Sequence, residues 1–133
     1  LVADVDTLGR DWFSATVAEG AVSSARCLVP LASIASLVLA PGQVEPSLVP
    51  VRDARAEASL SMRLGLPFVL RDLCRRRWAL DLVVGATTLH GTIDRVGRDH
   101  LDLAMHEPGS ARRNTAVREV RVVPLAQIVL VSY

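Results

Sequence analysis

The chain has 133 residues, of which half are hydrophobic and only 4% aromatic, and its formal net charge is +1. This length allows one ordinary domain or two very small ones, and the apolar content is enough for a packed core of aliphatic side chains. A nearly neutral chain has no whole-surface attraction to nucleic acid or membranes. Any basic function must therefore be local.

The first 40 residues share two motifs with the C-terminal part of the chain. The segment "VDTLGRDWF" at 5–13 aligns with "IDRVGRDHL" at 93–101, and "LVPLASIASLVL" at 28–39 aligns with "VVPLAQIVLVSY" at 122–133. Both matches occur in the same order along the chain, so we interpret them as two copies of one structural unit. Pro30 and Pro124 mark the break before the last strand of each copy, because proline cannot donate to a strand ladder.

The remaining elements follow in chain order. Residues 40–53 contain three prolines and predict a linker or extended connection. The second half of 54–77 has helical spacing, with Pro67 in the first turn and an apolar face of Val69, Leu70, Leu73 and Cys74. Five short strands are then predicted at 78–84, 87–96, 100–106, 117–123 and 128–133, with a tight turn at 85–86 after the first of them.

Histidine and aspartate side chains gather on the second and third of these strands. The alternation places Leu101, Leu103 and Met105 inward and His100, Asp102 and His106 outward, with His90 and Asp94 on the neighbouring strand. Such a set can hold Zn²⁺. The first copy, however, has Trp12, Ser14 and Ala18 at the three outward positions. We therefore interpret the cluster as a solvated sheet face, and we expect no metal site, no cofactor and no catalytic site.

The helix, the strand order, Gly91, the "VGRDHLDL" turn and the "VPLAQI" break resemble the Sm/LSm small-barrel family, including its Hfq-type bacterial members. The chain looks closest to actinobacterial proteins with two such barrels, some of which carry the label "Fis family". The resemblance covers residues 64–133 well and 1–39 in part. It implies an RNA-binding fold, but the turn asparagine of the usual nucleotide pocket and the basic dipeptide before the last strand are absent here. "GRDH" and "PLAQ" stand in their places.

The Gly-Arg-Asp turns are the part of the motif that both copies keep. We expect Gly9 and Gly97 to take the positive φ of a tight turn. Asp11 and Asp99 are expected to accept backbone N–H groups within the turn. The exposed arginines are the candidate contacts for a partner or for nucleic acid. They are Arg10, Arg95, Arg98, Arg75, Arg76, Arg77, Arg112 and Arg113.

These observations predict a mainly β fold of two tandem Sm-like, SH3-like small barrels. A partial first barrel spans 1–40, a linker spans 41–58, and a second barrel with an N-terminal helix spans 59–133. The first copy lacks a helix and a first strand; either these lie upstream of Leu1 in a longer product or another chain supplies them. Because the two cysteines, Cys27 and Cys74, are solitary and there is no signal sequence or apolar run long enough for a membrane span, we expect a cytoplasmic protein with no membrane association.

Function follows from the same features. We expect a non-catalytic binding or assembly module that forms a homo-oligomer through barrel edges, because unpaired strand edges recruit another strand. One hypothesis adds RNA or DNA binding through the arginines, which predicts a steep loss of affinity with salt. The alternative is a protein scaffold or oligomerisation module with no affinity for nucleic acid. The near-neutral charge favours the alternative, and the family resemblance favours the first hypothesis.

Overall fold

A computed structural model describes residues 3–19, 23–49, 60–109, 113 and 115–133. It contains eight strands: β1 Ala3–Leu8, β2 Trp12–Glu19, β3 Ser23–Pro30, β4 Ala79–Val84, β5 Thr87–Val96, β6 His100–Met105, β7 Glu119–Pro124 and β8 Ile128–Ser132. The helices are α1 Pro41–Leu48 and α3 Leu66–Arg76, and three 3-10 turns are η1 Leu31–Ser33, η2 Ser61–Arg63 and η3 Leu125–Gln127. No helix within these ranges is long and apolar enough to cross a membrane.

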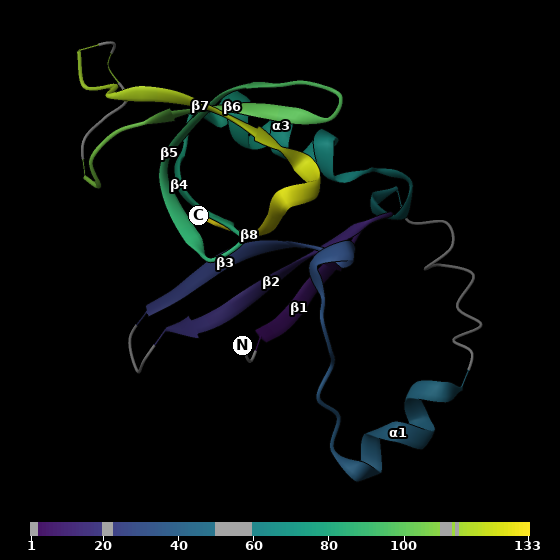
Figure 1. Ribbon diagram of the computed structural model, residues 1–133. Coiled ribbons are helices and arrows are strands. Elements are labelled where there is room, and N and C mark those ends of the chain that lie inside the picture. Colours follow the sequence, from purple (N-terminus) through teal and green to yellow (C-terminus); the bar gives the residue numbers. More distant parts are fainter. Residues whose placement is uncertain (1–2, 20–22, 50–59, 110–112, 114) are drawn as a thin grey trace.

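All eight strands form one antiparallel sheet in the order β1-β2-β3-β8-β4-β5-β6-β7. The prediction of a mainly β fold is confirmed, but the expected pair of separate barrels is replaced by one open sheet whose ends do not close. The two copies share one sheet because β8 pairs with β4 on one side and with β3 of the other copy on its second side. In Figure 1, β4–β8 curl beside α3 and β1–β3 extend from them.

The second copy has the predicted elements. The five strands expected from alternation correspond to β4 to β8, and Gly85 has the positive φ that its tight turn needs. The predicted helix begins one residue before Pro67, and its buried residues are Leu66, Leu70 and Leu73. Val69 and Cys74 pack against the same core while remaining partly exposed. The periodicity of apolar residues is sufficient to predict these elements, because the helix and the strands each bury one face.

The core lies mainly in the second copy. One cluster joins the buried face of α3 to leucines and isoleucines of β4, β5, β6 and β8, and Trp12 and Leu28 of the first copy enter it. A second and smaller cluster consists of Ala15, Cys27 and Val29. The first copy therefore has little core of its own and depends on the second for burial.

Two segments differ from the sequence expectation. Part of the predicted linker is the short helix α1, with Pro41 in its first turn and the Gln43 side chain accepting the Ala40 N–H at 2.8 Å. None of its residues is buried, so local capping rather than packing holds it. Residues 34–39, the expected last strand of the first copy, form no strand and pair with none of the described strands. Residues 50–58 of the linker lie outside the described residues.

The two copies have the same local structure from their first aligned strand to the 3-10 turn, whereas 34–39 and β8, which also align, differ. Gly9 donates to the Trp12 carbonyl and Gly97 to the His100 carbonyl, each at 2.8 Å. A register shift falls between Val5 and Thr7 in the first copy and between Ile93 and Arg95 in the second. Each copy ends a strand at its proline, Pro30 or Pro124, and continues into a 3-10 turn. The backbone correspondence thus extends over the hairpin, the turn and the break.

Candidate functional site

The glycines of the Gly-Arg-Asp turns are needed for space and not for backbone conformation. The prediction of positive φ is wrong for both, since the only described glycines with positive φ are Gly85 and Gly109. A Cβ on Gly9 would lie 2.2 Å from the Trp12 indole, and a Cβ on Gly97 would lie 2.8 Å from the His100 imidazole. In both copies the ring that begins the next strand covers the glycine.

The two aspartates of these turns differ in their backbone partners. The Asp11 carboxylate accepts the N–H of Leu66, at the start of α3, at 2.7 Å. A negative charge there is favourable because the first N–H groups of a helix lack partners. Asp99 accepts a hydrogen bond from His100 Nδ1 at 2.7 Å, which is the main reason that its pKa lies below the usual value. The backbone N–H of Asp99 itself, within the turn as the sequence predicts, also lowers this pKa. The first turn therefore fixes the helix, whereas the second remains at the surface.

The arginines of the two turns are exposed, as the sequence predicts. Arg10 lies over Gly65, with its guanidinium 3.6 Å from the Asp11 carboxylate. Arg98 is exposed and makes no hydrogen bond or ion pair within the described part of the chain. Arg113 is also exposed, and Arg112 lies outside the described residues. Arg98 is thus the turn residue most available to a partner.

The helix arginines are mostly paired. Arg75 and Arg76 contact the Asp72 carboxylate at 3.3 and 2.6 Å, and their hydrogen bonds lower the pKa of Asp72. Arg77 ends α3 in a left-handed conformation and reaches Asp94 at 2.9 Å. Such exposed pairs contribute about 0–1 kcal/mol each. They also reduce the local positive charge that the sequence alone suggests.

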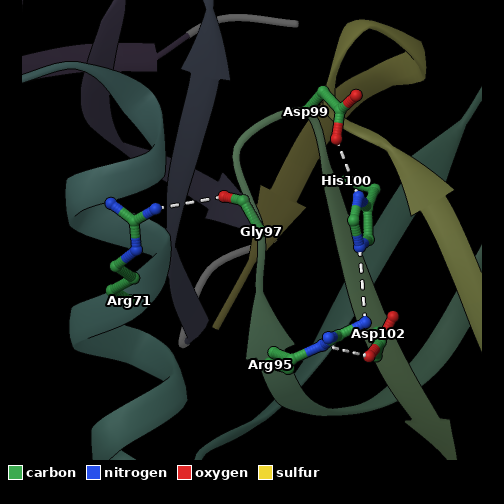
Figure 2. A network of polar contacts seen from close by, with 6 residues as sticks. All are labelled: Arg71, Arg95, Gly97, Asp99, His100 and Asp102. Carbon is green, nitrogen blue, oxygen red and sulfur yellow. Dashed lines mark hydrogen bonds and ion pairs between the residues drawn. The ribbon is translucent and has the colours of Figure 1, made fainter.

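Arg95 belongs to a polar network on β5 and β6 (Figure 2). Its Nε lies 2.7 Å from the Asp102 carboxylate, and its terminal nitrogen lies 3.5 Å from His100 Nε2. From the neighbouring helix, Arg71 donates to the Gly97 carbonyl at 3.1 Å. The network links the second turn to α3 and orients Arg95 along the sheet surface.

The histidines do not gather into one cluster. His106, expected to face solvent, is buried: Thr92 contacts its Nε2 at 2.9 Å and its Nδ1 lies 3.1 Å from the Glu107 carbonyl. It follows the end of β6, so the strand alternation no longer applies. His90 packs edge-on against it, with ring centroids 5.3 Å apart, and contacts Asp81. Over the described ranges, no three His, Cys, Asp or Glu side chains are arranged to hold a metal ion.

Cys27 is a poor candidate for nucleophilic chemistry. Cys27 donates its S–H to the Ala15 carbonyl at 3.4 Å, and burial raises the pKa of its thiol. It lines a cavity of about 220 Å³ whose other walls come from β2, β4, β5 and β8, and Asp81 is among the lining residues. A thiol with a raised pKa stays protonated and is therefore a weak nucleophile.

An aromatic cluster at the seam between the copies was missed by sequence reasoning. The rings of Trp78 and Tyr133 lie 5.7 Å apart and 30° from parallel, and the Arg76 guanidinium lies 5.2 Å from the Trp78 ring centroid. Arg26 and Thr16 line the same hollow. Burial raises the pKa of Tyr133, so its ring is neutral at physiological pH. Trp78 and Tyr133 are far apart in the sequence, and only the β4–β8 pairing brings them together.

The outer side of β7 is an unpaired strand edge. Among the described strands β7 pairs with β6 alone, and the exposed residues on it include Val120 and Val122. The Leu125 N–H donates to the Asp99 carbonyl, so the backbone groups of Leu125 point towards the β6 side. Along β7 these groups alternate in direction from one residue to the next. The N–H and C=O of Val122 therefore point away from β6. The opposite edge, β1, has Asp4 and Asp6 and an interrupted register, both of which discourage strand addition.

No family model, curated protein or solved structure matches this chain. The arrangement of β7, the aromatic cluster and the arginines is therefore the basis on which a function can be assigned.

Proposed function

We propose that this chain is a non-catalytic binding and assembly module whose binding site is the outer edge of β7. The proposal rests on the exposed edge of β7. Within the part of the chain that the structure describes, β7 has one neighbouring strand and its outer backbone groups pair with no other strand, and Val120 and Val122 are exposed beside them. A strand from a partner would satisfy these groups and cover the valines, as in strand addition to an exposed sheet edge. We infer that copies of this chain associate through this edge.

The finer fold assignment belongs to this proposal. We infer that each copy is an Sm-like unit, the second complete from α3 to β8 and the first reduced to β1–β3. The order of elements supports this: a helix, four strands, a 3-10 turn and a fifth strand that pairs with the first of the set. In-chain pairing of β8 with β3 is a precedent for joining two such units through a strand edge.

Light scattering on the full chain across a concentration series tests the proposal. We expect an assembly larger than one chain in the wild type and a single chain in Val122→Pro. Proline removes the outward N–H of Val122 while leaving the β6–β7 hydrogen bonds in place. Val122→Thr keeps the N–H and the branched shape, so it is the matched control and should still assemble. A wild-type chain that is monomeric at all concentrations would overturn the proposal.

A second candidate function is binding of single-stranded nucleic acid at the aromatic cluster. Trp78 is exposed, and Arg76 and Arg26 stand beside it and Tyr133. Stacking of a base on an aromatic ring contributes about 1–3 kcal/mol, and arginine pairs with the phosphate. Trp78 directly follows Arg75, Arg76 and Arg77 in the sequence, and the fold adds the ring of Tyr133 beside it.

Tryptophan fluorescence with an oligouridine probe tests the second function, since the other tryptophan, Trp12, is buried. Quenching that weakens steeply with salt and is lost in Trp78→Ala supports it. Arg98→Ala is the control for a general effect of charge, because Arg98 is exposed and belongs to another part of the sheet. Absence of quenching at low salt, or quenching that persists in Trp78→Ala, refutes it.

A further inference from the structure

We propose that the cavity at the seam between the two copies binds a small alkylammonium ion, with the Asp81 carboxylate as its counter-charge. This site is separate from the β7 edge and from the aromatic cluster, so the inference goes beyond the proposed function. The cavity has a volume of about 220 Å³. A cavity of about 150 Å³ already holds a molecule of the size of benzene, so there is room for a short amine.

The strand register brings the walls of the cavity together. β3, β8 and β4 lie side by side at the seam (Figure 1). Cys27 of β3 lies opposite Ser132 of β8, and Ser132 lies opposite Asp81 of β4 on its other side. Residues that lie opposite each other in antiparallel strands have their side chains on the same face of the sheet. The cavity wall therefore crosses from one copy to the other.

The cavity has both apolar and polar lining. The hydrocarbon comes from Val17, Ala25, Val83 and Leu130, and the oxygen atoms come from Asp81, Thr88 and Ser132. A primary ammonium group has three N–H donors and no acceptor, so one carboxylate and two hydroxyl groups can satisfy it. The apolar side chains suit the hydrocarbon tail of the same ion. Because Asp81 and Thr88 are exposed, a ligand can reach the cavity from solvent.

The Asp81 carboxylate is held in place and keeps an oxygen for a ligand. Its Oδ1 accepts a hydrogen bond from His90 Nδ1 at 2.7 Å. Within the described part of the chain, its Oδ2 has no hydrogen-bond partner, and neither have the hydroxyl groups of Thr88 and Ser132. A carboxylate has about four lone-pair sites, so one bond to His90 does not exhaust it.

The charge around the cavity favours a cation. No arginine is among the described residues that line it, and the sequence has no lysine. A second carboxylate acts on the same wall: burial is the main cause of the raised pKa of Cys27, and the charge of Asp6 adds to it. An anion would be repelled by these two aspartates, and a neutral molecule would gain nothing from them.

A ligand in this cavity contacts both copies of the repeat. Only two residue pairs, Cys27 with Ser132 and Leu28 with Val131, join β3 to β8 in the described sheet. A molecule that binds the folded state alone shifts the unfolding equilibrium towards it. We therefore expect a bound alkylammonium ion to raise the unfolding temperature of the whole chain.

Three probes with the same tail test the chemistry of the site on the full chain. They are butylammonium, 1-butanol and butyrate, added to the labelled protein and followed by amide chemical shifts in NMR. Butylammonium should shift the amides of Cys27, Val83 and Leu130. It should bind about three- to tenfold more tightly than 1-butanol, because a hydrogen bond to a charged group is stronger than a neutral one. Butyrate should not bind.

Substitutions at the charge and at the wall test the site itself. Asp81→Asn keeps an acceptor for His90 but removes the charge, so butylammonium should bind about three- to tenfold more weakly, like 1-butanol. Asp4→Asn removes a carboxylate from an exposed position of β1 and is the matched control. Ala25→Leu fills the cavity and should abolish binding of both probes. Ala25→Ser leaves room and should keep it.

Each outcome decides for or against the site. Equal affinity of the wild type for butylammonium and 1-butanol overturns the ammonium ion as ligand, and this comparison requires no variant to fold. Equal losses in Asp81→Asn and Asp4→Asn indicate a general effect of charge and overturn the role of Asp81. Absence of shifts at the cavity residues overturns the site. The β7 edge is judged separately, by assembly.

Discussion

The two copies of the repeat share the backbone of the hairpin, the turn and the proline break, but their surroundings are opposite. Val5 of the first copy and Ile93 of the second occupy the same register position, opposite Ala15 and Leu103 respectively. Val5 is 57% exposed, whereas Ile93 is 0% exposed. The second copy has α3 and β4 to cover its sheet, and the first has neither. The same strand pattern therefore produces a core in one copy and a surface in the other.

The first copy compensates by docking its turn on the segment before α3. The Trp12 indole N–H donates to the Leu64 carbonyl at 2.9 Å, and the Arg10 N–H donates to the same carbonyl at 3.1 Å. Its counterpart, His100, is partly exposed, covers Gly97 and makes its side-chain hydrogen bonds with the surface residues Asp99 and Arg95. The comparison shows that a motif shared by both copies does not determine whether its side chains are buried.

The largest expected effect of a single change is at Trp12. Trp12→Ala should lower the free energy of unfolding by about 3–5 kcal/mol, because it empties a buried site and leaves the Leu64 carbonyl with one donor fewer. His100→Ala at the equivalent position should change it by less than about 1 kcal/mol. Urea denaturation of both variants measures the difference. Equal losses would contradict the asymmetry of the copies.

A second pair of variants compares the strands directly. Ile93→Ala should cost about 2–5 kcal/mol, because it removes a fully buried side chain from the main core. Val5→Ala should stay within about 0.5 kcal/mol, as is usual for exposed positions. Thermal unfolding followed by circular dichroism checks both. A large loss in Val5→Ala would mean that another part of the molecule covers the first copy in solution.

The elements of the second copy could be predicted from sequence because each buries one face and ends at a proline, glycine or charged turn. The helix face and the five strands needed no tertiary information. The open sheet could not be predicted in this way. The open sheet depends on the pairing of β8 with β3. The periodicity of a strand's sequence does not indicate which strand of the other copy it will pair with.

The candidate sites were harder to predict for the same reason. The exposed arginines were identified from sequence, but their pairing with Asp72, Asp94 and Asp102 was not. Trp78 and Tyr133 meet across β4 and β8, so their proximity has no local signal. His106 was placed on the wrong side, because the strand ends one residue before it. Local patterns predict elements, and contacts between distant strands determine sites.

The glycines of the two turns provide a third comparison, in which the expected loss of stability is intermediate. Gly9→Ala forces a Cβ into the buried Trp12 indole, which is held by its hydrogen bond, and should cost about 1–3 kcal/mol. Gly97→Ala meets His100, whose exposed ring can move aside, so its cost should be smaller. Denaturant unfolding of the two variants ranks them. A reversed order would show that the second turn is the more rigid one.

The smallest expected effect is a pH dependence confined to the second turn. The pKa of Asp99 lies below its ordinary value of 3.8 because His100 donates to its carboxylate. A carboxyl with a lowered folded-state pKa stabilises the fold above the unfolded-state pKa and loses that contribution as pH falls through the folded-state value. Asp99→Asn should therefore be slightly less stable than the wild type at neutral pH, and the two should converge in acid below pH 3.8. Because Asp99 is exposed, the gap should shrink in high salt as well. Thermal midpoints measured from neutral pH into acid, at low and high salt, check both trends, and a gap that widens in acid would contradict the assigned hydrogen bond.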